Sequence, residues 1–86
     1  HVKKLNVCGV HVDDISVLSS VPNLEVCALS VNNVSDLSVF LECPQIQELY
    51  LRKNAIDELD QILFLGAAHQ LRVVNLTDNP VCNHPG

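Results

Sequence analysis

The chain has 86 residues, of which 48% are apolar and 3% aromatic, and its formal net charge is −5. This length suits one small domain, and this composition predicts a core of Leu, Val and Ile. Ten acidic residues against five basic ones argue against nucleic-acid binding, which needs a broad basic stripe. No apolar run approaches the roughly 18 residues of a membrane span, so we expect no membrane segment.

Apolar residues recur with a period near 22 in the frame LxxLxLxxN. The clearest copies are 24–32 and 46–54; 71–79 repeats the frame after a longer step, and 2–10 is a weaker copy. This pattern is typical of leucine-rich repeats, which stack into a solenoid. We therefore predict an α/β fold with one domain over residues 1–86, divided into repeats 2–23, 24–45, 46–70 and 71–86.

Each repeat begins with an alternating segment that predicts a short strand. In chain order, strands of one parallel sheet on the concave face are expected at Lys4–Val7, Val26–Leu29, Glu48–Leu51 and Val73–Leu76. The second half of each repeat is apolar at a spacing of about three, which favours a short helix or 3₁₀ turn on the convex face. Asp57–Leu65 is the best helix candidate, because acids occupy its first turn and Gly66 follows it.

Two of the four cysteines fall in core columns of the repeat. Cys27 aligns with Leu49, and Cys43 aligns with Val21 and Leu65, so each replaces an aliphatic residue. Free cysteine behaves as a small buried hydrophobe, and this use suits a reducing compartment. We therefore expect an intracellular, cytoplasmic protein.

Asn32, Asn54 and Asn79 occupy one column, directly after the strands. We interpret them as a structural Asn ladder, because a buried amide can both donate to and accept from the backbone of a turn. A sugar or metal site is a much weaker explanation. The first repeat has Val10 in this column, so we expect its turn to lack this bond and to be looser.

Both ends of the chain depart from the frame. Asn79-Pro80 is typical of the start of a C-terminal capping motif, but only residues 81–86 follow, so we expect the cap to be cut short or disordered. The chain begins at His1 rather than Met, and we expect it to be part of a longer protein.

Alternate strand positions face outward on the concave face. There we predict a partner-binding surface made of Val26, Ala28, Glu48, Tyr50, Arg52, Val73 and Asn75. Tyr50 is the only tyrosine and lies centrally with Arg52 beside it, and Tyr and Arg are enriched among residues that dominate interface energetics. The simpler alternative is that Tyr50 only covers the sheet. A small basic cluster of Arg52, Lys53 and Arg72 is a further expectation.

No pattern of a catalytic, metal or cofactor site is visible in the sequence. The histidines are scattered, and Cys82-Asn83-His84 lacks the paired ligands of a structural zinc site. The glycines are isolated, so there is no phosphate-binding loop. A one-layer solenoid also offers no enclosed pocket for catalysis. We expect a non-enzymatic protein without metal or cofactor.

Several segments resemble a known family. The segments that carry the resemblance include Lys3-Lys4-Leu5-Asn6, Leu29-Ser30-Val31-Asn32, Glu48-Leu49-Tyr50-Leu51-Arg52-Lys53-Asn54 and Asn79-Pro80-Val81-Cys82. They resemble the N-terminal domain of the cilia- and flagella-associated protein 410 family, within the SDS22-like class of leucine-rich repeats. The resemblance implies a protein-interaction scaffold at the basal body of a cilium or flagellum. It also implies a NIMA-related kinase partner, bound through a C-terminal domain outside these residues.

Two other functions stay open at this point. One is a regulatory leucine-rich-repeat subunit of a phosphatase, and the other is an RNA-associated repeat protein of the splicing machinery. Co-purification of a phosphatase favours the first, and salt-sensitive RNA binding favours the second.

Overall fold

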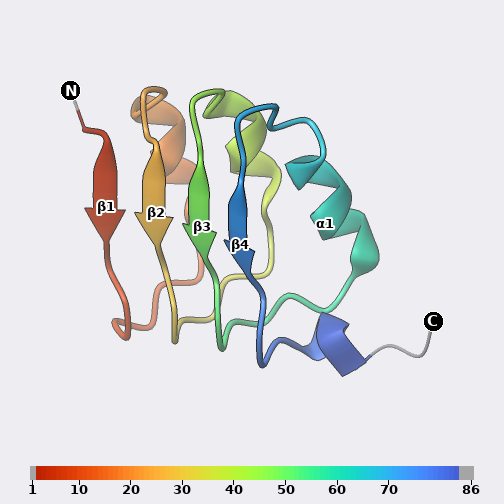
Figure 1. The fold of residues 1–86 in the computed structure, drawn as a ribbon. Helices are drawn as coiled ribbons and strands as arrows, with labels where there is room; N and C mark the ends of the chain where they lie inside the picture. The colour runs from red at the N-terminus through yellow and green to blue at the C-terminus, as the bar shows by residue number, and fades with distance from the viewer. Residues whose placement is uncertain (1, 84–86) are drawn as a thin grey trace.

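The computed structural model describes residues 2–83, and its strands form one parallel sheet in the order β1-β2-β3-β4 (Figure 1). The strands are β1 (Lys4–Asn6), β2 (Val26–Ala28), β3 (Glu48–Tyr50) and β4 (Val73–Asn75). The helical segments are the 3₁₀ helices η1 (Ser16–Ser20), η2 (Ser38–Glu42) and η3 (Pro80–Asn83) and the α-helix α1 (Leu59–Leu65). Helices η1, η2 and α1 cover the convex side and leave the concave face of the sheet open, which confirms the predicted leucine-rich-repeat architecture.

Each strand ends one residue earlier than the alternation predicted, although pairing continues past the strand end. The backbone N–H of Val7 donates to the carbonyl of Ala28 at 3.0 Å, and that of Leu29 donates to Tyr50 at 2.8 Å. The backbone hydrogen bonds between repeats therefore continue for at least one residue beyond the end of each of these strands.

Helix α1 begins at Leu59, not at the predicted Asp57. Glu58 is extended, with φ −114° and ψ 133°, and is the residue that precedes the helix. Of the acids expected in the first turn, only Asp60 lies there. The helix ends at Leu65, directly before Gly66 as predicted, and the N–H of Gly66 donates to the carbonyl of Leu63 at 3.1 Å.

The sheet register equals the repeat period, so the inward columns form a continuous core. Leu5 pairs with Cys27, Cys27 with Leu49, and Leu49 with Val74. Cys27 and Leu49 are fully buried, whereas Val74 is 38% exposed. Because β4 is the last strand, Val74 packs against a neighbouring strand on one side only.

Two cysteines are core residues, as their alignment with aliphatic columns predicted. Cys27 and Cys43 are fully buried, and Cys8 and Cys82 are exposed; all four are free thiols. Burial raises the pKa of the Cys27 thiol to about 12, so this thiol stays protonated and acts as a hydrophobe.

Asn32 bonds two repeats together through its side chain. Its Nδ2 donates to the carbonyl of Leu29 in its own repeat at 2.8 Å and to that of Val7 in the preceding repeat at 3.0 Å. Its Oδ1 accepts from the N–H groups of Val10 at 3.2 Å and Val12 at 2.8 Å. The turn of the first repeat is therefore bonded, and our expectation that Val10 leaves it without an amide partner was wrong.

The same arrangement recurs at Asn54 and Asn79, which are 8% and 1% exposed. Asn54 Oδ1 accepts from Val34 in the preceding repeat at 3.0 Å. Asn79 Oδ1 accepts from the N–H groups of Asn54 at 3.1 Å and Ile56 at 3.2 Å. Each asparagine thus completes the turn of the repeat before it, which explains why the first repeat needs no asparagine of its own.

The residue immediately before this column adopts a left-handed backbone conformation in every repeat. The φ angles are 72° at Gly9, 60° at Val31, 56° at Lys53 and 64° at Asp78. Glycine adopts such angles freely and Asp tolerates them, but a β-branched residue is strained there. Val31 therefore stores backbone strain that nothing in the alternation of apolar residues indicates.

Candidate partner-binding face

The strand register places six of the seven predicted partner-binding residues in two rows across the concave face. Paired residues of a parallel sheet point to the same side, so the rows are Val26, Glu48 and Val73, then Ala28, Tyr50 and Asn75. Arg52 lies two residues beyond Tyr50, past the strand end. Val73 and Arg52 are exposed and the other five are partly buried, so all seven are accessible to a partner.

Tyr50 is held in place by its neighbours at the centre of this face. Its hydroxyl donates a hydrogen bond to Glu48 Oε1, and Glu48 Oε2 lies 3.4 Å from Arg72 Nη2. The bond from Tyr50, followed by the contact with Arg72, lowers the pKa of the Glu48 carboxyl. The same hydrogen bond raises the pKa of the Tyr50 hydroxyl, because ionising the phenol would remove the donated proton. Tyr50 is therefore a fixed, neutral aromatic group.

The expected basic cluster of Arg52, Lys53 and Arg72 is not formed. Arg72 precedes β4 and contacts Glu48, whereas Arg52 follows β3 and its Nη1 lies 3.7 Å from Asp78 Oδ2. In a parallel sheet these two positions lie at opposite ends of the strands. The repeat frame did not predict the Glu48–Arg72 contact. The 25-residue step pairs Glu48 with Val73, which places Arg72, the residue before Val73, on the strand next to Glu48.

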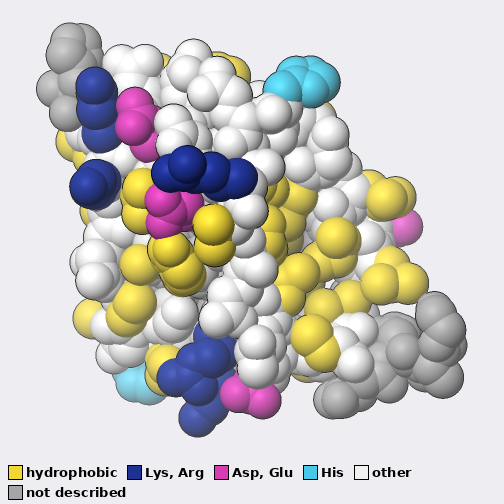
Figure 2. All heavy atoms as spheres, in the orientation of Figure 1, with side chains coloured by type: hydrophobic (Ala, Val, Ile, Leu, Met, Phe, Trp, Pro, Cys, Tyr) yellow, Lys and Arg dark blue, Asp and Glu magenta, His cyan; other side chains and the backbone are white. Residues whose placement is uncertain are grey.

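Figure 2 shows how these side chains cover the concave face. Hydrophobic side chains gather over β2 and β3, with basic side chains both above and below them. A second hydrophobic area lies beyond β4, towards α1, where the core of the last repeat is open.

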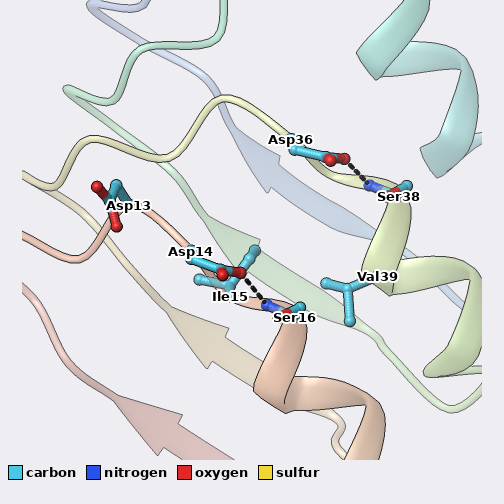
Figure 3. A pocket seen from close by; sticks show the side chains of 7 residues that line it. All are labelled: Asp13, Asp14, Ile15, Ser16, Asp36, Ser38 and Val39. Carbon is cyan, nitrogen blue, oxygen red and sulfur yellow. Dashed lines mark hydrogen bonds between the residues drawn. The ribbon is translucent and has the colours of Figure 1, made fainter.

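An acidic hollow beside the starts of η1 and η2 is explained by local turns in which an aspartate bonds the backbone two residues on (Figure 3). It has a volume of about 260 Å³, and its lining includes Asp13, Asp14 and Asp36. Asp14 Oδ1 accepts from the N–H of Ser16 and Asp36 Oδ1 from that of Ser38, both at 2.9 Å. These bonds lower the pKa of both carboxyls, because each backbone N–H stabilises the ionised form. The two aspartates are therefore structural.

Residues 2–83 contain no group of three or more His, Cys, Asp or Glu side chains arranged to hold a metal ion. Of the weak Cys82–His84 candidate, His84 lies outside the described residues, and the Cys82 thiol donates to the carbonyl of Leu76 at 3.0 Å. No helix within residues 2–83 is long and apolar enough to cross a membrane.

The repeat frame, the single parallel sheet and the helix-covered convex side define the chain as a leucine-rich-repeat domain. Solved structures agree: an internalin of Listeria monocytogenes superposes with a TM-score of 0.82 and 28% sequence identity, over 91% of this chain and 22% of that one. A chain of the Drosophila melanogaster SNF/U2A′ complex superposes with a TM-score of 0.71 over 95% of this chain and 62% of its own length, at 19% identity.

In sequence, the chain matches cilia- and flagella-associated protein 410. It is 44% identical to the mouse protein over 95% of this chain, and 43% identical to the human protein over 94%. The chain spans about a third of the length of these relatives, 33% and 32% respectively. No protein-family model matches the chain.

Proposed function

We propose that this chain is a non-enzymatic protein-interaction domain of a cilium- or flagellum-associated scaffold, and that its concave face binds the partner. The ciliary part of the proposal is supported by the name of the relatives it matches. A cytoplasmic location at the basal body belongs to the same proposal. The NIMA-related kinase implied by the resemblance is not assigned to this face.

The observation that carries the proposal is the fixed position of Tyr50. Its hydroxyl is bonded to Glu48, and the neighbouring positions in the register are Ala28 and Asn75. An aromatic ring that is already ordered loses little conformational freedom on binding, so more of its contact energy becomes affinity. Partly buried aromatic residues of this kind are frequent interaction hot spots.

The test is proximity labelling in ciliated cells with three versions of the chain fused to a biotin ligase. Tyr50→Ala removes the anchor, and Val17→Ala truncates an apolar side chain that is 71% exposed on convex helix η1. We expect ciliary or basal-body proteins labelled by the unmodified chain and by Val17→Ala, and their loss in Tyr50→Ala. Identical labelling by all three chains would contradict a concave binding face, provided circular dichroism shows that each is folded.

The two alternatives have weaker support. The likeness to the SNF/U2A′ complex, at 19% identity, is a likeness of fold. A regulatory role on a phosphatase predicts co-purification of that enzyme with the unmodified chain. Both alternatives are read out in the same labelling experiment, as enrichment of splicing factors or of a phosphatase in place of ciliary proteins.

A further inference from the structure

The charges of this chain are segregated between its two sides. All five basic residues belong to the strands or the segments that flank them: Lys3, Lys4, Arg52, Lys53 and Arg72. Only three of the ten acids share these segments, namely Glu25, Glu48 and Asp78. The strand side therefore carries five positive against three negative charges, a net +2, and the seven remaining acids make the rest −7. The overall charge of −5 conceals a positive face.

The three acids on this side are already paired. Glu25 lies 4.0 Å from Lys3, Glu48 lies 3.4 Å from Arg72, and Asp78 lies 3.7 Å from Arg52. Within residues 2–83, Lys4 and Lys53 have no carboxylate at ion-pair distance. These two lysines form no ion pair, although the charge of Lys4, in the same row as Glu48, contributes to the lowered pKa of the Glu48 carboxyl.

The two lysines lie at opposite ends of the apolar centre. Lys4 shares the row of Val26 and Glu48, and Lys53 lies five positions further along the chain direction than Glu48. A strand advances about 3.3 Å per residue, and because β3 ends at Tyr50 and Lys53 lies in a left-handed turn, the separation along the strands is less than ~17 Å. An extended segment of about five residues spans that distance. The register places Val26, Ala28 and Tyr50 between the two lysines. Figure 2 shows a hydrophobic area on this face with basic side chains above and below it.

The acids on the convex side do not cancel this local field. The seven remaining acids lie in the helical segments or in the loops before them, not in the strands or the segments that flank the strands. Charges in water at physiological ionic strength are screened beyond about 8 Å. A partner in contact with the concave face is therefore affected mainly by the charges of that face.

We propose that the concave face binds an acidic segment of a partner protein, with acidic side chains at both ends and an apolar side chain between them that contacts Tyr50. This inference rests on the proposed function and specifies the chemistry of the partner. The acidic ends contact Lys4 and Lys53, and about five residues separate them. Two lysines outside ion pairs are too few for a nucleic-acid site, which neutralises several phosphates.

The test is selection of a displayed library of random peptides on the immobilised 86-residue chain. Tight binders are then measured against the double variant Lys4→Gln/Lys53→Gln. Its matched control is Ser19→Glu/Leu41→Glu, which lowers the net charge by the same two units at exposed positions of the convex helices η1 and η2. We expect a consensus with two acidic positions around an apolar one, and about tenfold weaker binding to the lysine variant, the loss of two exposed ion pairs. The control should bind as the unmodified chain does.

Each other outcome has one meaning. Peptides without acidic positions that lose affinity only on Tyr50→Ala overturn the acidic partner and leave the proposed function standing. Peptides unaffected by Tyr50→Ala and by the lysine variant overturn both. Equal weakening by the lysine variant and by the convex control shows an effect of net charge and overturns the role of this face. If polyuridylate binds the chain more tightly than the selected peptides do, the partner of this face is a single-stranded nucleic acid and the acidic protein segment is overturned.

Discussion

Replacing Asn54 with alanine tests the asparagine ladder most directly. Asn54 Nδ2 donates to the carbonyls of Leu29 and Leu51, both at 3.0 Å, and its Oδ1 accepts from Val34 at 3.0 Å. The two carbonyls keep a second donor, because Asn32 Nδ2 also reaches Leu29 and Asn79 Nδ2 also reaches Leu51. Among residues 2–83 the N–H of Val34 has no other acceptor, and Val34 is fully buried.

The magnitude follows from that count. One buried N–H without a partner costs about 1–3 kcal/mol, so we expect Asn54→Ala to lower the free energy of unfolding by about 2 kcal/mol. Asn79→Ala leaves two such groups, those of Asn54 and Ile56, and should cost about 4 kcal/mol. For a domain of this size, 1 kcal/mol corresponds to roughly 4–8 °C in melting temperature.

The assay is thermal and urea unfolding followed by circular dichroism, with Asn33→Ala as the control. Asn33 neighbours the ladder in sequence and is exposed, so its truncation should change stability by less than about 0.5 kcal/mol. The expected order of destabilisation is Asn79→Ala, then Asn54→Ala, then Asn33→Ala. A melting temperature for Asn54→Ala equal to that of Asn33→Ala would refute the assignment of Asn54 as the partner of Val34.

Two further predictions follow from the turns and from the tyrosine. Val31→Asn should raise the free energy of unfolding in urea by about 1 kcal/mol, because Asn tolerates the φ of 60° that strains Val31. The control Val17→Asn, at an exposed position, should give no gain. A lower free energy of unfolding for Val31→Asn would contradict the strain. Tyr50, the single tyrosine, should ionise above its ordinary pKa of 10.0 in an ultraviolet titration of the folded chain, and Glu48→Gln should move that midpoint down. The Tyr50 pKa is raised from 10.0 on folding and the Glu48 pKa is lowered from 4.5, so their hydrogen bond stabilises the fold between pH 4.5 and pH 10.0. This stabilisation is lost as Glu48 becomes protonated at lower pH or as Tyr50 ionises at higher pH. A Tyr50 midpoint unmoved by Glu48→Gln would disprove the bond.

The repeat pattern was sufficient to predict the fold, for a physical reason. A period shared by all apolar positions of the frame constrains which residues face inward. A 22-residue step in sequence became a one-strand step in the sheet at Leu5, Cys27 and Leu49. The strand ends and the start of α1 were less accurate, because the apolar pattern does not report backbone dihedral angles. Val31 shows this limit clearly, since its left-handed conformation is imposed by the turn and opposed by its own side chain.

The candidate site was predictable in its positions but not in its contacts. The frame placed Glu48 and Tyr50 on the outward side of one strand, as the register of β2 and β3 shows. It did not predict that Arg72, from across the longer step between the last two repeats, contacts Glu48. Which side chains meet across β3 and β4 depends on the register after the longer 25-residue step, and the apolar positions do not indicate which polar side chains pair there. That a partner protein binds this face stays a prediction.

The backward direction of the asparagine bonds has a consequence for synthesis of the chain on the ribosome. The N-terminal end leaves the ribosome first, but the turn around Val34 receives Asn54 only from the following repeat, and Asn54 and Ile56 receive Asn79 only from the repeat after that. Each repeat is therefore completed one repeat late. While the next repeat is missing, the most recent turn lacks the asparagine that accepts from its backbone N–H groups.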